Sequence, residues 1–299
     1  MPDADRKSER GGAGGQGAQG RPYAVARLLL FLVGTAACVA LLALVTSAFL
    51  AAPLTGFWGL ALPHGVIAVS ALIAALAMLR WVDREEQPLD ELGLPLSVGA
   101  ALRGSLRGIA LGALLVASLV AVQLIPGWLK PMADEGTLAA WLRHMGAMAI
   151  LFAIGGASEE LLFRGYGFQR MVEWLGIRWA VVVDAALFGA LHAINPMVSI
   201  VPLINIALAG ALLAGAYLRT RSLWVAIGLH WSWNWFTTLF DRPVSGLEFD
   251  APVYDFRELG PDLLTGGAFG PEGGLLATLV LVVAIAWIFR APFPEARSA

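Results

Sequence analysis

The sequence predicts an all-α fold: a polytopic transmembrane helical bundle of about eight membrane helices with a polar cavity in its core. Hydrophobic residues make up 58% of the 299 residues and charged residues only 14%, and the mean hydropathy is +0.73. Because a soluble domain carries about 25% charged residues, most of this chain is expected to lie in lipid. Two further observations support the prediction: a series of long apolar stretches, and ionisable side chains inside three of them.

Eight apolar stretches are long enough, or nearly long enough, to cross a bilayer. A hydrocarbon core about 30 Å thick requires about 20 apolar residues at 1.5 Å per residue. The stretches are residues 28–50, 57–79, 108–125, 145–163, 179–194, 196–218, 223–240 and 274–289. The fifth is short, which indicates either a strongly tilted helix or a helix that follows a re-entrant piece.

The basic residues predict the orientation of the bundle. If the N-terminus lies inside, 16 of the 20 Lys and Arg residues fall on the cytoplasmic side. Basic residues accumulate in cytoplasmic loops. We therefore expect an integral, multi-pass protein of the cytoplasmic membrane with both termini in the cytoplasm.

The composition predicts one domain between two tails. Residues 1–24 are rich in Gly, Gln and charge and are expected to form a disordered cytoplasmic tail. Residues 25–290 form the transmembrane domain, with its motif core at 145–240, and residues 291–299 form a short cytoplasmic tail. The acidic outer loop 241–273 is predicted to be an irregular cap.

Two adjacent glutamates end the fourth apolar stretch. A carboxylate in the hydrocarbon core costs about 2.5–3.5 kcal/mol on insertion scales, so packing alone does not explain the pair. Glu160 and Arg164 share a helix face at i, i+4, and Arg164 is expected to reach the cytoplasmic headgroups. Glu159 points elsewhere without a sequence-local cation, which makes it the predicted reactive carboxylate.

Two later stretches also carry polar stripes at helical spacing. Asp184, Phe188 and His192 follow at four-residue intervals, and His230 is followed by Asn234. These faces are expected to converge on a pocket with Glu159. Asp184 either orients His192 from behind or lies at the inner membrane surface, and the surface position is favoured.

Such a pocket supports two related chemistries. In the first, Glu159 and His192 activate a water while His230 and Asn234 stabilise an oxyanion. In the second, Glu159, His192 and His230 hold a divalent metal such as zinc. The His-Glu-x-x-His spacing of many zinc proteases is absent from the sequence, and no other cofactor is expected.

Other polar side chains in apolar stretches are predicted to have no chemical role. His64 and His144 are expected near the outer interface. Asn205 is expected to form hydrogen bonds between helices.

Three motifs in this order resemble the motif series of the CPBP family, which contains the type II CAAX prenyl endopeptidases and bacterial relatives linked to bacteriocin processing and immunity. The motifs are Glu159-Glu160-x-x-x-Arg164, Phe188-x-x-x-His192 and His230-x-x-x-Asn234. The resemblance covers about residues 145–240. It is specific because each motif lies on its own apolar stretch.

The resemblance implies an intramembrane endopeptidase. By position, Glu159 resembles the catalytic glutamate and His192 the histidine that helps it, while His230 and Asn234 resemble the residues that stabilise the oxyanion. Glu160, Arg164 and Phe188 are implied to be supporting residues. The family has been described both as metalloproteases and as glutamate-dependent enzymes, so the metal stays an open alternative.

The implied substrates are prenylated CAAX-type C-termini or bacterial membrane peptides. The expected partners are membrane lipid and a membrane-associated peptide or protein, with no nucleic acid, and the sequence predicts no oligomeric state. The alternative from another class is a non-catalytic transporter or bacteriocin-immunity protein that uses the same cavity for binding.

Overall fold

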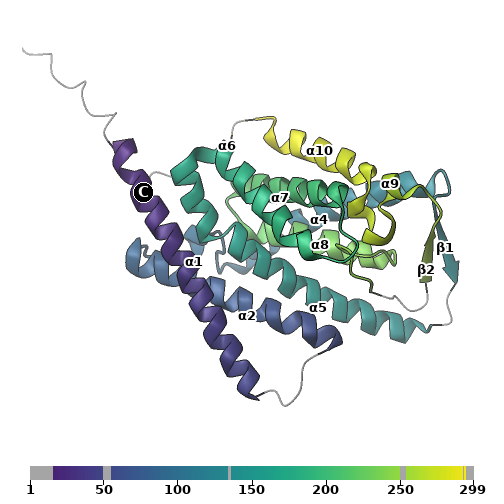
Figure 1. Cartoon of the computed structure of the whole chain (residues 1–299), viewed down its shortest axis with the longest axis horizontal. Helices are drawn as coiled ribbons and strands as arrows, with labels where there is room; N and C mark the ends of the chain where they lie inside the picture. Colours follow the sequence, from purple (N-terminus) through teal and green to yellow (C-terminus); the bar gives the residue numbers. More distant parts are fainter. Residues whose placement is uncertain (1–15, 50–54, 134–135, 250–253, 292, 294–299) are drawn as a thin grey trace, which may run out of the picture.

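The computed structural model describes the chain except residues 1–15, 50–54, 134–135, 250–253, 292 and 294–299. The eight longest helices are α1 (Gln16–Phe49), α2 (Gly56–Ala77), α4 (Val98–Leu124), α5 (Leu138–Phe163), α6 (Tyr166–Leu191), α7 (Ile200–Thr220), α8 (Leu223–Leu239) and α10 (Leu275–Phe289). The short elements are α3 (Pro88–Leu92), β1 (Leu129–Ala133), β2 (Tyr254–Glu258) and α9 (Asp262–Thr265). Most long helices run along the bundle, α1 crosses it at one end, and β1 and β2 lie at the other (Figure 1).

Each predicted apolar stretch overlaps one of the long helices, so the all-α polytopic bundle is confirmed. Within the described residues, five helical runs are long and apolar enough to cross a membrane: Pro22–Ala48, Gly56–Val82, Val98–Leu124, Leu138–Ile194 and Ile200–Thr220. The fourth run joins α5 to α6, and α10 is a shorter apolar helix. These runs make the chain a multi-pass membrane protein, while the count of eight crossings stays a prediction.

The predicted loops and tails differ from the structure in two places. Helix α1 begins at Gln16, inside the predicted tail 1–24, whereas residues 1–15 and most of 291–299 lie outside the described residues. The outer loop 241–273 is more regular than predicted, because it contains β2, which pairs antiparallel with β1 from Leu129 opposite Glu258 to Ala133 opposite Tyr254. This pairing joins segments far apart in the sequence, which a local pattern does not indicate.

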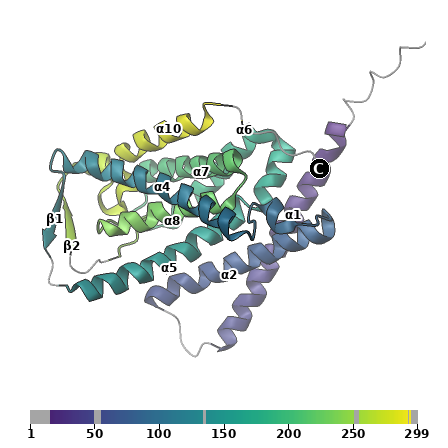
Figure 2. The same cartoon turned by 180° about the vertical axis from the view of Figure 1, so that it is seen from behind.

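Close packing against α4 fixes the position of α8. Glycines recur every four residues on α4, at Gly104, Gly108 and Gly112. A Cβ atom on Gly108 would lie 2.1 Å from the Val225 carbonyl oxygen, and one on Gly112 would lie 2.0 Å from Ser232 Oγ. Small residues at this spacing let two helices approach closely, and α4 lies alongside α8 (Figure 2).

Two tryptophans fix α8 against α5. Trp231 Nε1 donates a hydrogen bond to the Ala149 carbonyl oxygen at 2.8 Å, and Trp235 Nε1 donates to the Met145 carbonyl oxygen at 2.9 Å. The two indole rings stack with centroids 5.2 Å apart. Helix α8 is therefore held on two sides, by α4 and by α5.

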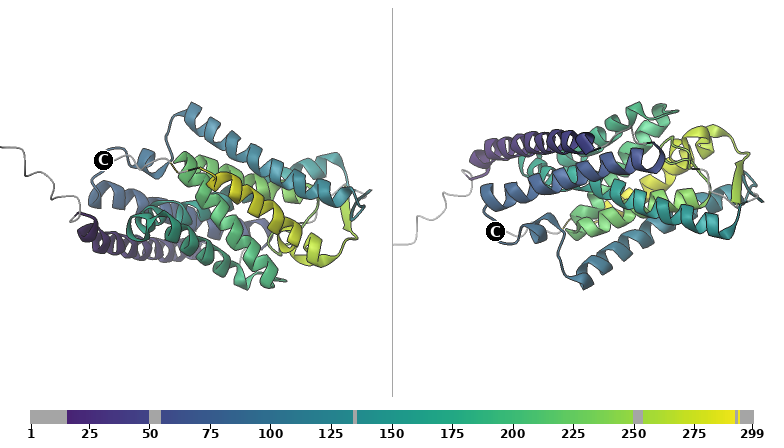
Figure 3. Two further views of the ribbon diagram at one scale, coloured as in Figure 1. Left: turned by 90° about the horizontal axis from the view of Figure 1, so that it is seen from above. Right: turned by 90° about the horizontal axis from the view of Figure 1, so that it is seen from below.

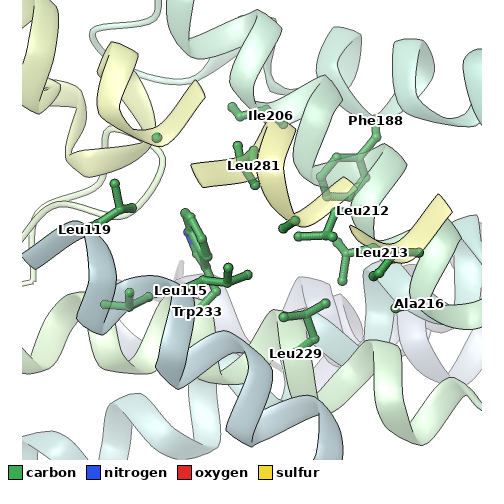
Figure 4. Close-up of a cluster of buried hydrophobic side chains, with 14 of the residues drawn as sticks. Leu115, Leu119, Phe188, Ile206, Leu212, Leu213, Ala216, Leu229, Trp233 and Leu281 are labelled. Atoms are coloured by element: carbon green, nitrogen blue, oxygen red, sulfur yellow. The ribbon is translucent and has the colours of Figure 1, made fainter. Parts of the chain in front are cut away.

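The buried hydrophobic residues form two large clusters. One lies between α4, α7, α8 and α10, and Figure 4 shows Trp233 within it beside Leu115 and Leu281. The other lies between α1, α2, α6 and α7 and includes the fully buried Phe31 and Tyr166. Helix α1 lies at the edge of the bundle, where it contacts α2 and α6 (Figure 3).

Candidate active site

The three sequence motifs meet in one cavity of about 450 Å³. Its walls come from α2, α5, the end of α6, α8 and the turn that follows α8. The lining includes all four predicted site residues: Glu159, His192, His230 and Asn234. The structure thus brings together side chains from three helices that the sequence only predicts to converge.

The cavity cluster consists of Glu159, His192 and His230. Glu159 Oε2 lies 3.9 Å from His192 Nε2 and 3.9 Å from His230 Nε2. This oxygen is buried and has no hydrogen-bond partner within the part of the chain that the structure describes. The side chain as a whole remains 23% exposed, because it faces the cavity.

Both histidine rings are oriented from behind by an acceptor. His192 Nδ1 donates to the Phe188 carbonyl oxygen at 2.7 Å, and His230 Nδ1 donates to Glu160 Oε1 at 2.9 Å. In a neutral ring with hydrogen on Nδ1, Nε2 carries a lone pair. Each ring therefore directs Nε2 toward Glu159, as a lone pair when the ring is neutral and as a donor when it is protonated.

Behind the cavity cluster lies a buried ion cluster of Glu160, Arg164 and Asp184, whose side chains are all fully buried. Arg164 Nη1 lies 3.1 Å from Glu160 Oε1, and its Nε lies 3.2 Å from Asp184 Oδ2. Arg164 Nη2 also donates to the Gly210 carbonyl oxygen at 2.9 Å. Two carboxylates against one guanidinium leave a formal charge of minus one, which a protonated His230 would balance.

The buried ion cluster corrects two predictions. Arg164 does not reach the headgroups, because its guanidinium is enclosed between α5, α6 and α7. Asp184 neither lies at the membrane surface nor contacts His192, because it pairs with Arg164. The predicted pairing of Glu160 with Arg164 is confirmed.

Phe188 contacts both clusters. The Arg164 guanidinium carbon lies 4.4 Å from the centre of the Phe188 ring, a cation–π distance. The same ring lies 4.9 Å from the His192 ring and 6.0 Å from the His230 ring. The supporting role of Phe188 stays a prediction.

A break in α6 explains how His192 reaches Glu159. Gly176 has φ 76° and ψ 161°, values that interrupt the helix. The chain leaves the end of α5 in the first leg of α6 and runs back in the second (Figure 1). His192 follows the last residue of the second leg, so the break sets the direction from which His192 approaches Glu159.

Sequence reasoning missed two residues that line the cavity. His64 on α2 lines the cavity, and its Nδ1 lies 2.9 Å from Ser158 Oγ, whereas nothing in the sequence indicated that it belongs to the site. Ser245, in the turn after α8, also lines the cavity, and both its N–H and its hydroxyl donate to Glu272 Oε2 at 2.8 and 2.7 Å. No local spacing signals these contacts, because each joins segments distant in the chain.

Asn205 and Glu272 connect α7 and α8 to the segment before α10. Asn205 Nδ2 donates to the carbonyl oxygens of Glu272 and Gly274 at 2.7 and 2.9 Å. Trp233 Nε1 donates to Glu272 Oε1 at 2.8 Å. Thr278 Oγ1 on α10 donates to Asn205 Oδ1 at 2.7 Å, which confirms the interhelical role predicted for Asn205.

The fold and the cavity together define a class: a multi-pass helical membrane protein with a buried acid–histidine site. Residues 139–236, about one third of the chain, match the family model described as Type II CAAX prenyl endopeptidase Rce1-like. The match contains all three motifs and confirms the predicted resemblance over residues 139–236. No curated protein and no solved structure matches the chain significantly.

The carboxylate and the two imidazoles of the cavity cluster are ligand types that suit a divalent metal, but the distances between them are longer than in a metal site. Within the described residues, no group of three or more His, Cys, Asp or Glu side chains is arranged to hold an ion. Zinc bonds of about 2.0–2.1 Å imply ligand atoms about 3.3 Å apart in a tetrahedral site. The 3.9 Å separations in the cavity cluster exceed this, so a shift of about 0.6 Å would be required.

Proposed function

We propose that this protein is an intramembrane endopeptidase that hydrolyses peptide bonds of membrane-associated substrates with a water activated by Glu159. One observation carries the proposal: the Nε2 atoms of His192 and His230 each lie 3.9 Å from Glu159 Oε2 inside a cavity of about 450 Å³. A carboxylate and two imidazoles that face one another in a membrane bundle are costly to maintain, which supports a chemical role.

In the proposed reaction, Glu159 is the general base. One hydrogen of the water bonds to the Glu159 carboxylate and the other to the lone pair on His192 Nε2. As Glu159 takes its proton, the water oxygen bonds to the carbonyl carbon of the substrate, and the π electrons move onto the carbonyl oxygen. Collapse of this intermediate breaks the C–N bond, and the proton held by Glu159 passes to the leaving amine.

The oxyanion requires hydrogen-bond donors. Asn234 lines the cavity one turn beyond His230 and supplies an amide N–H group. His230 donates from Nε2 only as an imidazolium, because in the neutral ring the hydrogen lies on Nδ1, bonded to Glu160. The formal charge of minus one on the buried ion cluster supports this protonated form.

If a divalent metal binds, Glu159, His192 and His230 would hold it, and it would supply a bound water of lowered pKa. Treatment of the purified protein with a chelator distinguishes the two forms of the mechanism. The metal-free mechanism predicts unchanged cleavage after dialysis against a chelator. Loss of cleavage that zinc restores would establish the metal form instead.

The proposed substrates are prenylated CAAX-type C-termini or peptides within the membrane. The family description of the matched segment and the apolar walls of the cavity, which include Leu60, Ile67 and Phe249, support substrates with an apolar portion. We further propose that residues 25–290 form one protease domain whose cavity opens toward the cytoplasm, with both termini on that side.

Proteolysis is tested by comparing new N-termini in membranes from cells that express the wild type or Glu159→Gln at matched levels. Peptides that arise only with the wild type are expected, and they would also identify the substrate. An identical set of N-termini from two folded proteins would contradict the proposal and favour the transporter or immunity alternative.

A further inference from the structure

His64 is the one titratable residue of α2 (Gly56–Ala77), and it lies on the wall of the substrate cavity. Leu60 and Ile67, about one helical turn away on either side, line the same wall. The three therefore form a stripe of two apolar side chains around one imidazole. The sequence motifs include no residue of α2, so nothing in them assigns a role to this ring.

The hydrogen bonds of Ser158 determine which nitrogen of His64 carries hydrogen. The Ser158 hydroxyl donates its only hydrogen to the Gly155 carbonyl oxygen at 2.7 Å. Ser158 Oγ, which lies 2.9 Å from His64 Nδ1, is therefore the acceptor, and the ring donates from Nδ1. In the neutral ring, Nε2 then carries the lone pair and is the atom left for a ligand.

Ser158, which accepts the hydrogen bond from His64, lies in the protein interior. Ser158 is fully buried and directly precedes Glu159 on α5. Its bond to His64 joins α2 to α5 at the level of the cavity cluster. Any ligand of His64 Nε2 would consequently lie at a set position relative to the reactive carboxylate.

A bound peptide needs an acceptor at this wall. A backbone N–H group that enters an apolar cavity without an acceptor loses about 1–3 kcal/mol. Among the described residues that line the cavity, Glu159 is the only acidic side chain and there is no Lys or Arg. In the proposed reaction Glu159 and His192 bond to the water and His230 donates to the oxyanion as an imidazolium, which leaves His64 as the imidazole acceptor for the substrate backbone.

We propose that His64 is a substrate-binding residue whose Nε2 accepts a hydrogen bond from a backbone N–H of the peptide substrate. Ser158 holds the ring in the required tautomer. The inference rests on the proposed endopeptidase function and extends it to the α2 wall. It assigns substrate recognition to the α2 wall and chemistry to Glu159, His192, His230 and Asn234.

Two amide substitutions separate the two nitrogens of the ring. The amide of His64→Asn reaches about the position of Nδ1 and keeps the bond to Ser158, whereas the amide of His64→Gln reaches about the position of Nε2 and keeps an acceptor for the substrate. Cleavage of a farnesylated CAAX-type peptide by the purified full chain provides kcat and KM. We expect His64→Asn to raise KM about tenfold with kcat within about twofold, and His64→Gln to stay within about threefold of the wild-type KM.

A binding measurement in the Glu159→Gln background makes the result independent of turnover. We expect the fluorescently labelled peptide to bind His64→Asn/Glu159→Gln about tenfold more weakly than Glu159→Gln alone. Equal affinities, or a wild-type KM for His64→Asn, would overturn the role of His64 and leave the proposed function intact. A wild-type protein that neither binds nor cleaves the peptide would overturn this inference together with the proposed CAAX-type activity.

Discussion

Glu159 and Glu160 are adjacent in the sequence, yet the structure places them in opposite surroundings. Glu159 faces the cavity and two Nε2 atoms, with its side chain 23% exposed, whereas Glu160 is fully buried between Arg164 and His230. A rotation of about 100° per residue around the helix is the origin of this difference. Identical side chains thus acquire different surroundings from the helix face on which they lie.

The two clusters around these glutamates differ in charge compensation. In the buried ion cluster every member has a charged partner within 3.2 Å, which is how a bundle tolerates buried charge. In the cavity cluster, by contrast, Glu159 Oε2 lies 3.9 Å from the Nε2 atoms of His192 and His230, which is beyond hydrogen-bond distance. The comparison predicts that the cavity cluster determines activity and the buried ion cluster determines stability.

The largest expected effect is on the cavity cluster. Glu159→Gln removes the general base and should lower kcat for peptide cleavage by about 10³-fold, because an amide does not take a proton from water. Its thermal unfolding in detergent should match the wild type within about 0.5 kcal/mol. Retained cleavage by this variant would show that Glu159 is not the base.

The second effect is on stability. Arg164→Leu leaves Glu160 and Asp184 buried without a cation, and we expect a loss of about 3–5 kcal/mol in the free energy of unfolding. Thermal denaturation and the yield of monodisperse protein measure this loss. The double variant Arg164→Leu/Asp184→Asn removes one of the stranded charges and should recover part of it. A wild-type melting temperature for Arg164→Leu would contradict the assigned ion pairs.

The third prediction concerns the hydrogen bond between His230 and Glu160, which joins the cavity cluster to the buried ion cluster. Glu160→Gln keeps an acceptor for His230 Nδ1 but removes the negative charge beside it. We expect kcat to fall about 10- to 100-fold, as for residues that orient a reactive histidine, with little change in KM. If kcat were unchanged, the imidazolium form of His230 would have no part in the reaction.

The smallest effect concerns the packing that positions α8. Gly108→Ala places a Cβ atom against the Val225 carbonyl oxygen, and we expect a loss of about 1–3 kcal/mol in stability together with reduced cleavage. Gly146→Ala on α5 is the matched control, because no heavy atom lies within 4 Å of its Cβ position. Equal melting temperatures for both variants would show that α4 does not constrain α8 as closely as described.

Several features of the site follow from local spacing. The i, i+4 pair of Glu160 and Arg164 was predictable, since neighbours on a helix face lie within reach of each other, and the structure places them 3.1 Å apart. The convergence of Glu159, His192 and His230 was expected from the need to shield polar faces from lipid. Their catalytic roles stay predictions until the variants are measured.

Other features depend on contacts that no local pattern encodes. Arg164 is buried and forms an ion pair with Asp184 because α6 packs against α5. The course of α6 depends in turn on the break at Gly176. His64 enters the cavity because α2 packs against α5, and Ser245 enters it because Glu272 holds the turn after α8. The antiparallel pairing of β1 with β2 was likewise beyond local reasoning.

The sequence alone determined the class of molecule: hydropathy specified a membrane bundle, and helical periodicity specified which polar side chains share a face. Both properties are encoded within a few residues along the chain, since they arise from solvation and from backbone geometry. The tertiary structure decided which ring nitrogen of His192 and of His230 faces the cavity, and that Arg164 pairs with Asp184 as well as with Glu160. These assignments depend on the distances between helices, which are settled only when the whole bundle packs.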